Sequence, residues 1–272
     1  MSTRPHSTPS TPGRPSKHCR RRQNGRPAPV DYRGVVLSAV AVVPSTPLLS
    51  EALAGAASAE LADLRAAVQA AGDELRRASQ TWIAVGSAAA TSVVDASSVG
   101  TYVGFGVDVV VSLSPSEGEP DRSMELAALT AGLVRVRCAP DLSVPTYLVA
   151  VDADAEECAR VAASVHAAID EAPGPVGLLV IADGSTMLTD KAPGAFDDRA
   201  EGMQRVIDDA VATADTAALG ALDVELCREL GVAGRAALQV AAAVVGSTSA
   251  TARTLYRDAP YGVGYHVAVW AA

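Results

Sequence analysis

The chain has few of the residue types on which most active sites depend. It contains four histidines in 272 residues, and two of them, His6 and His18, lie near the N-terminus. Only His166 and His266 remain for the rest of the chain, so a site that needs several imidazoles cannot be built. We expect His166 to be exposed or structural on a helix, and His266 to be a buried or edge residue of the last strand.

Other absences exclude further classes of protein. No run approaches the roughly 20 apolar residues of a membrane span, and none of the GxGxxG, P-loop, GxSxG or HExxH motifs is present. The aromatic share is only 4%, so alanine, valine and leucine must fill the core. Because no two cysteines form a CxxC pair, we expect free thiols in a reducing cytoplasm. The four cysteines are Cys19, Cys138, Cys158 and Cys227.

Residues 1–33 differ from the rest of the chain. They carry eight Lys or Arg against one acid, a charge of +7, so the total of −9 leaves −16 on residues 34–272. Lacking large apolar side chains, the first segment is predicted to be a disordered tail. Its Arg20–Arg22 run would suit nucleic acid or an anionic membrane, but a solvated tail, or a start codon placed too early, is the simpler interpretation. The acidic remainder argues against nucleic acid on the folded domain.

A secretory signal is the alternative interpretation of basic residues followed by the apolar stretch 35–43. Asp31 interrupts the approach, and Pro44 and Pro47 follow the apolar stretch at once. A first core strand over 35–43, ended by these prolines, explains the pattern better.

Apolar runs and helical spacing alternate along residues 34–272, which predicts an α/β domain: a three-layer sandwich around a central mixed, mostly parallel sheet. The last two strands are predicted to form an antiparallel edge. Predicted strands cover 35–43, 81–86, 107–113, 146–151, 177–181, 251–257 and 263–270. Predicted helices cover 51–79 with a break near Gly55, 124–136, 154–170, 197–213, 216–230 and 233–245.

Acidic residues around Asp154 suit two interpretations. Asp152, Asp154, Glu156 and Glu157 could form a metal cluster, but no matching turn glycine or further ligand accompanies them. Asp154 followed three residues later by Glu157 is typical of a helix N-terminus, so capping is favoured.

The buried strand 177–181 runs directly into Asp183-Gly184-Ser185. Open α/β sheets bind ligands at the carboxyl ends of their strands, so this loop is predicted to form one wall of a site. Asp183 would bind a cation or accept a ligand proton there, or would cap the following turn. Lys191 belongs to a charged cluster that includes Asp197 and Asp198, one of which is predicted to cap the next helix.

Three stretches together resemble a known family. They are Val43–Leu49, Ile181–Gly194 and Ala259–Tyr265. They look like the class III extradiol ring-cleavage dioxygenases and the related Memo proteins, closest to an Ala-rich actinobacterial branch. The resemblance implies an α/β sandwich and, in active members, Fe(II) held by two His and one Glu, with a further His as acid/base.

The residues of this chain depart from that pattern. Ser45, or Thr46, stands where the resemblance places the first ligand His, and Gly86–Ala90 holds none where the second belongs. Thr186 and Met187 stand where the acid/base His is implied. A carboxylate ligand cannot be placed, and serine is a poor substitute for imidazole on Fe(II). No metal or other cofactor is therefore expected.

The predicted function is a dioxygenase-fold protein without the iron triad, whose cleft binds a small molecule or a partner protein. The rival is a working enzyme, an aromatic ring-opening dioxygenase or one with a divergent site that uses Asp183, Lys191 and His266. Nucleic acid is expected only through the tail, a membrane is not, and homo-oligomerisation is left open. The candidate pocket residues are Ser45, Thr46, Ser87, Asp183, Ser185, Lys191, Tyr261 and His266.

Overall fold

The computed structural model describes residues 37–247 and 250–271. The chain separates into two units, Met1–Tyr32 and Arg33–Ala272, and every described residue belongs to the second. The predicted tail, Cys19 and the start of the predicted strand 35–43 lie outside the described residues.

A seven-stranded mixed sheet forms the centre of this unit, in the order β3-β6-β2-β7-β1-β9-β8. The four central strands, β6, β2, β7 and β1, are parallel, while β3 at one edge and β9 and β8 at the other are antiparallel. This confirms the α/β class, the mostly parallel sheet and the antiparallel closing pair. The strands are β1 (Leu37–Val43), β2 (Thr81–Ala88), β3 (Ser92–Val94), β6 (Thr146–Ala150), β7 (Val176–Ile181), β8 (Thr251–Asp258) and β9 (Tyr265–Ala271).

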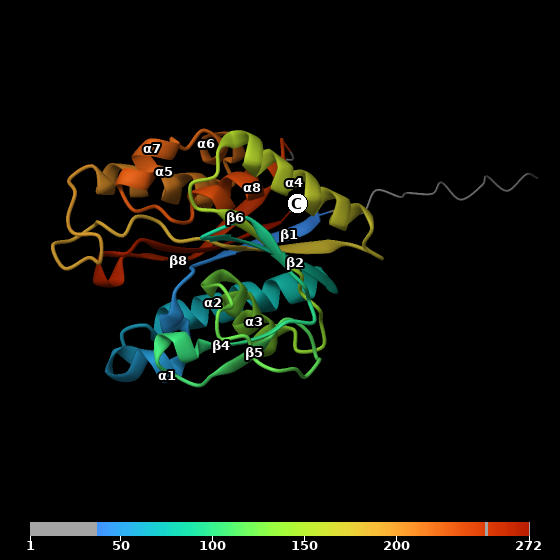
Figure 1. Ribbon diagram of the computed structural model, residues 1–272. Coiled ribbons are helices and arrows are strands. Elements are labelled where there is room, and N and C mark those ends of the chain that lie inside the picture. The colour runs from blue at the N-terminus through green and yellow to red at the C-terminus, as the bar shows by residue number, and fades with distance from the viewer. Residues whose placement is uncertain (1–36, 248–249, 272) are drawn as a thin grey trace, which may run out of the picture. The chain divides into compact units, whose positions relative to one another are not determined.

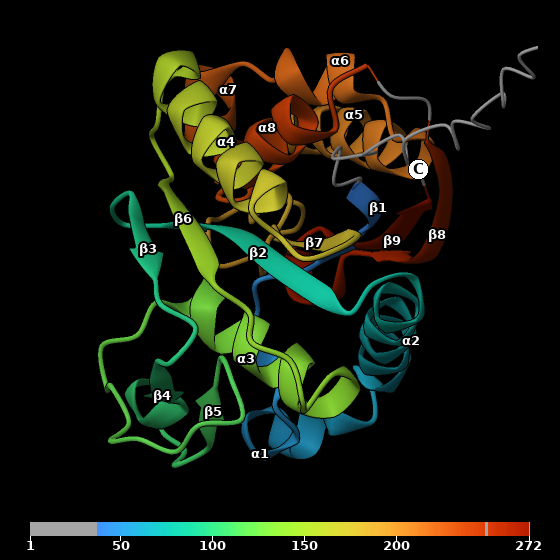
Figure 2. The same cartoon turned by 90° about the vertical axis from the view of Figure 1, so that its right-hand side faces the viewer.

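Helices cover both faces of the sheet, which gives three layers (Figures 1 and 2). One face carries α4 (Ala155–Asp170), α5 (Ala200–Thr213), α6 (Thr216–Gly220), α7 (Val224–Glu229) and α8 (Arg235–Val245). The other carries α1 (Glu51–Ala54), α2 (Ala62–Ala78) and α3 (Leu126–Cys138).

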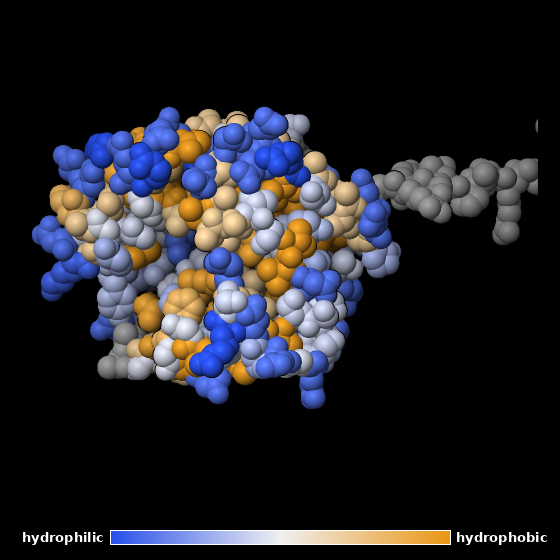
Figure 3. All heavy atoms as spheres, viewed as in Figure 1, coloured by the Kyte–Doolittle hydropathy of each residue, from blue (hydrophilic) through white to orange (hydrophobic). Residues whose placement is uncertain are grey.

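The central strands form near-continuous apolar runs because both of their faces are buried. Successive side chains point to opposite faces, so Leu178 and Val180 of β7 join the core beneath α4–α8, while Leu179 and Ile181 join the core beneath α2 and α3. On the face shown in Figure 3, hydrophilic residues alternate with apolar ones.

The predicted helix details were partly right. Gly55 ends α1 with a φ of 48°, so the predicted break is confirmed. Asp154 caps α4 by accepting a hydrogen bond from the Glu157 amide at 2.8 Å, which confirms capping. The cap predicted at Asp197 or Asp198 is wrong, because α5 has Arg199 at its N-cap, and Asp197 accepts from the Arg199 amide just before the helix begins.

Two further boundaries differ from the sequence prediction. The run 107–113 does not join the main sheet, since only β5 (Val110–Ser112) is a strand and it pairs with β4 (Val99–Thr101) in a separate two-stranded sheet. An apolar run shows that a strand is buried but not which sheet it joins. The predicted helix 216–230 is two helices, because Asp223 caps α7 by accepting a hydrogen bond from the Leu226 amide at 2.7 Å.

Two more findings concern the cysteines and the helices of the described residues. Cys138, Cys158 and Cys227 are free thiols. Within the described ranges, no helix combines the length and the apolar character needed to cross a membrane.

Candidate functional site

The carboxyl ends of three parallel strands meet at one edge of the sheet. Val43 of β1 and Gly86 of β2 both lie opposite Ile181 of β7. Ser45 and Asp183, just beyond β1 and β7, and Ser87, near the end of β2, therefore lie at the same level of the sheet. This is the edge at which open α/β sheets bind ligands.

Asp183 and Ser45 are in direct contact at this edge. The Ser45 amide donates a hydrogen bond to Asp183 Oδ1 at 2.6 Å. Burial raises the pKa of the Asp183 carboxyl to about 7, and the Ser45 amide opposes that rise. Part of the residue still reaches solvent. A carboxyl group that changes charge near neutral pH, at a strand end and in a residue that solvent partly reaches, is a candidate ligand-binding group.

Tyr265 is a neighbour of Asp183 that the sequence analysis did not select. Its side chain is buried, and its pKa is raised to about 12, first by burial and then by the charge of Asp183. The Thr46 hydroxyl opposes this rise, and Thr46 is itself buried as the cap of a 3-10 turn, where it accepts from the Leu48 amide. The only sequence signal for Tyr265 was its place at the end of the Ala259–Tyr265 stretch.

Ser87 and Ser185 have structural partners. The Ser87 hydroxyl accepts from the Ala237 amide at 3.2 Å, in the first turn of α8. Ser185 is fully buried, and its hydroxyl donates to the Leu230 carbonyl at 2.6 Å and accepts from the Met187 amide at 3.1 Å. Both serines fix the backbone around the strand ends rather than present a hydroxyl to a ligand.

Lys191 and Tyr261 lie on the surface. Lys191 is exposed in the loop after β7. Tyr261 is 41% exposed, has a left-handed backbone with a φ of 60°, and donates from its hydroxyl to Glu60 Oε2 at 2.5 Å. This hydrogen bond raises the pKa of Tyr261 above its ordinary value. Both side chains therefore face solvent rather than the Asp183 carboxyl.

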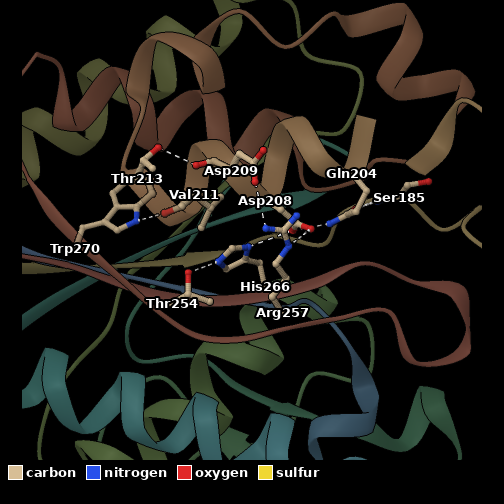
Figure 4. Close-up of polar contacts among 10 residues, drawn as sticks. All are labelled: Ser185, Gln204, Asp208, Asp209, Val211, Thr213, Thr254, Arg257, His266 and Trp270. Carbon is tan, nitrogen blue, oxygen red and sulfur yellow. Dashed lines mark hydrogen bonds and ion pairs between the residues drawn. The ribbon is translucent and has the colours of Figure 1, made fainter. Parts of the chain in front are cut away.

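His266 belongs to a second polar cluster, between α5 and the β8–β9 hairpin (Figure 4). It is buried, and its imidazole lies 3.1 Å from Asp208 Oδ1 through Nδ1 and 3.1 Å from Thr254 Oγ1 through Nε2. These contacts confirm the buried, hydrogen-bonded histidine expected from the sequence. Asp208 also accepts from Arg257 Nε at 2.8 Å.

Gln204 joins this cluster to the loop after β7. Its side chain accepts from the Ser185 amide at 2.8 Å and donates to Asp208 Oδ1 at 2.9 Å. A Cβ atom added at Gly184 or at Gly264 would overlap the Gln204 amide group. The two glycines therefore form a slot for the Gln204 amide group, and any residue with a Cβ atom at either position would close it.

The iron chemistry implied by the family resemblance does not fit these residues. Ser45 holds Asp183 through its backbone, and Thr46 is buried as a cap. The end of β2 offers Ser87, whose hydroxyl is taken up by the Ala237 amide. In residues 37–247 and 250–271, no group of three or more His, Cys, Asp or Glu side chains could hold a metal ion.

Comparisons with known proteins assign no function. No protein-family model matches the chain, and no curated protein matches it. Among solved structures, it is similar to the crystal structure of the uncharacterized protein JW3007 from Escherichia coli K12. That match has 10% identity and a TM-score of 0.45, and it covers 86% of this chain and 100% of that one.

Proposed function

We propose that this chain is a member of the class III extradiol dioxygenase-like and Memo-like superfamily that has lost the iron-dependent reaction. In this proposal the strand-end site around Asp183 binds a small polar molecule without opening an aromatic ring. The sequence stretches that resemble the family lie at this site, while the residues at the ligand positions are unsuited to Fe(II).

The contact between Ser45 and Asp183 supports this proposal most directly. The two residues are 138 positions apart in the chain and are joined at 2.6 Å. Folded proteins seldom keep a desolvated carboxyl group, because its charge is costly unless it is paired. A carboxyl group with a pKa of about 7 and a backbone donor at one oxygen is stabilised further by any ligand that supplies a second donor.

The expected ligand therefore carries a hydrogen-bond donor, and preferably a basic nitrogen. An ammonium group would pair with the ionised Asp183 and offset the cost of its burial. The buried Tyr265 hydroxyl, which is neutral at physiological pH and lies near the Asp183 carboxyl, is the second hydrogen-bonding group in this proposal. Catecholamines, simple catechols and aliphatic amines form the first panel to test.

Anaerobic purification tests the loss of iron chemistry. The protein is purified without oxygen, its metal content is measured, and Fe(II) is added with a panel of catechols under air. We expect iron well below one equivalent per chain and no coloured ring-opened product. Stoichiometric iron together with such a product would refute the proposal and support the rival, an active ring-opening dioxygenase.

Calorimetry tests the binding site. Each panel compound is titrated into the wild type, into Asp183→Asn and into Asp190→Asn, which changes an exposed carboxylate of the same loop. A compound that binds should lose at least about tenfold in affinity with Asp183→Asn, which is about 1.4 kcal/mol, and should bind Asp190→Asn like the wild type. Equal affinity for all three proteins would place the ligand elsewhere.

A further inference from the structure

The cluster around His266 has the geometry of a nucleophile, a base and a carboxylate that orients the base. Thr254 Oγ1 lies 3.1 Å from His266 Nε2, and His266 Nδ1 lies 3.1 Å from Asp208 Oδ1. Such a set is recognised by its distances and roles rather than by sequence order. We propose that Thr254 is a hydroxyl nucleophile activated by His266 and that it accepts an acyl group from a carboxylic ester.

The hydrogen bonds around Asp208 determine which imidazole nitrogen carries the proton. Arg257 Nε donates to Asp208 at 2.8 Å and Gln204 Nε2 donates at 2.9 Å, so the carboxylate is the acceptor in both contacts. His266 Nδ1 must then donate to it, which leaves the lone pair of Nε2 facing the Thr254 hydroxyl. The neutral imidazole is thus oriented as a base toward Thr254 Oγ1.

The carboxylate and the imidazole are buried, whereas Thr254 is an exposed residue. The side chains of Asp208 and His266 are 8% and 4% exposed, whereas Thr254 is an exposed residue of the edge strand β8. The outermost member of the cluster is therefore Thr254, on the solvent side of the imidazole.

A cavity of about 580 Å³ lies beside the cluster, on the side of Gln204, Asp208 and Arg257, which line it, whereas Thr254 and His266 do not. Arg257, next to the imidazole (Figure 4), and Arg205 line this wall together with four acidic residues, Asp198, Glu201, Asp208 and Asp258. Phe196, which is 55% exposed, and Leu188 give it an apolar part.

The chemical step needs no group beyond this cluster, the ester and water. Thr254 Oγ1 attacks the carbonyl carbon while His266 Nε2 takes the hydroxyl proton. The carbon–oxygen bond to the alcohol breaks, and Nε2 returns the proton to the departing alkoxide. Water then adds to the acyl-Thr254 ester by the same proton route and releases a carboxylic acid, so the hydroxyl is regenerated.

The test uses the full chain and p-nitrophenyl acetate as the acyl donor, with release of p-nitrophenolate followed by absorbance and the acetyl group located by peptide mass mapping. We expect acetylation at Thr254. Thr254→Val should remove that label and the release that accompanies it, whereas Thr254→Ser should keep both. Thr251→Val, a change of an exposed threonine on the same strand, is the matched control and should react like the wild type.

A second variant separates catalysis from structure. His266→Ala should slow acetylation of Thr254 by roughly 100-fold. Added imidazole should restore labelling of Thr254 beyond the labelling of Thr251, which reports acetylation by the acetylimidazole that forms directly from the ester. If His266→Ala does not fold, the Thr254 variants decide alone, because their side chain is exposed. Wild-type rates in Thr254→Val, or an acetyl group found only on other residues, would overturn the proposal.

Discussion

Replacing Asp183 with asparagine should stabilise the protein, and the gain should increase with pH. Burial raises the pKa of Asp183 from 3.8 to about 7. Between these values the unfolded chain has released the proton while the folded chain still holds it. Protonation therefore favours the folded state below pH 3.8, and this contribution is lost as the pH rises through about 7.

The size of the effect follows from the same two pKa values. The interval between 3.8 and about 7 corresponds to an unfavourable free energy of about 4 kcal/mol for the ionised carboxylate above pH 7. Because solvent reaches part of the residue, screening reduces this to about 2–4 kcal/mol. Asparagine keeps an oxygen that accepts from the Ser45 amide and carries no charge, so it should recover most of that free energy.

Urea denaturation at pH 4, 6 and 8 measures the difference. We expect the free energies of unfolding of wild type and Asp183→Asn to be nearly equal at about pH 4 and to differ by about 2–4 kcal/mol at pH 8. Asp190→Asn, on the exposed part of the same loop, should change stability by less than about 0.5 kcal/mol throughout. A difference that does not vary with pH, or a variant less stable than wild type at pH 8, would refute the reasoning.

Two further substitutions test the surroundings of the strand ends by thermal or urea denaturation. Ser87→Ala removes the acceptor for the Ala237 amide and should cost about 1 kcal/mol, and no loss would mean that water replaces the cap. Gly264→Ala places a methyl group on the Gln204 amide and should cost at least about 2 kcal/mol, whereas Gly174→Ala, where a Cβ meets no atom within 4 Å, should cost less than about 1 kcal/mol. Equal effects of the two alanines would contradict the slot.

The fold class followed from the sequence because its signals are local. Strands β2 and β7 are apolar runs with clear ends, and the helices between strands show their spacing over many residues. Strand β3 has only three residues, two of them exposed, and lacked such a signal. The run that contains β5 had the right character, but its sheet is chosen by contacts with β4 that no local pattern encodes.

The residues of the candidate sites likewise differ in how much the local sequence reveals about them. Asp183 stood out because it is a carboxylate just beyond the buried strand β7. Ser45 lies just beyond β1, the strand that pairs with β7. Asp208 could not be found from the sequence, because an aspartate beside Asp209 on a helix is typical of a solvent-facing pair. Only the packing of α5 against β9 buries Asp208 against His266, 58 positions away in the chain.

The slot around Gln204 has a consequence for natural variation. Position 204 touches two loop positions, 184 and 264, whose missing side chains leave room for its amide. A relative with alanine at either glycine would need a shorter residue than glutamine, and that residue would lose the bonds to the Ser185 amide and to Asp208. Positions 184, 204 and 264 should therefore change together among homologues. A substitution at one of them alone would mark lineages in which the loop after β7 is no longer hydrogen-bonded to the Asp208–His266 cluster.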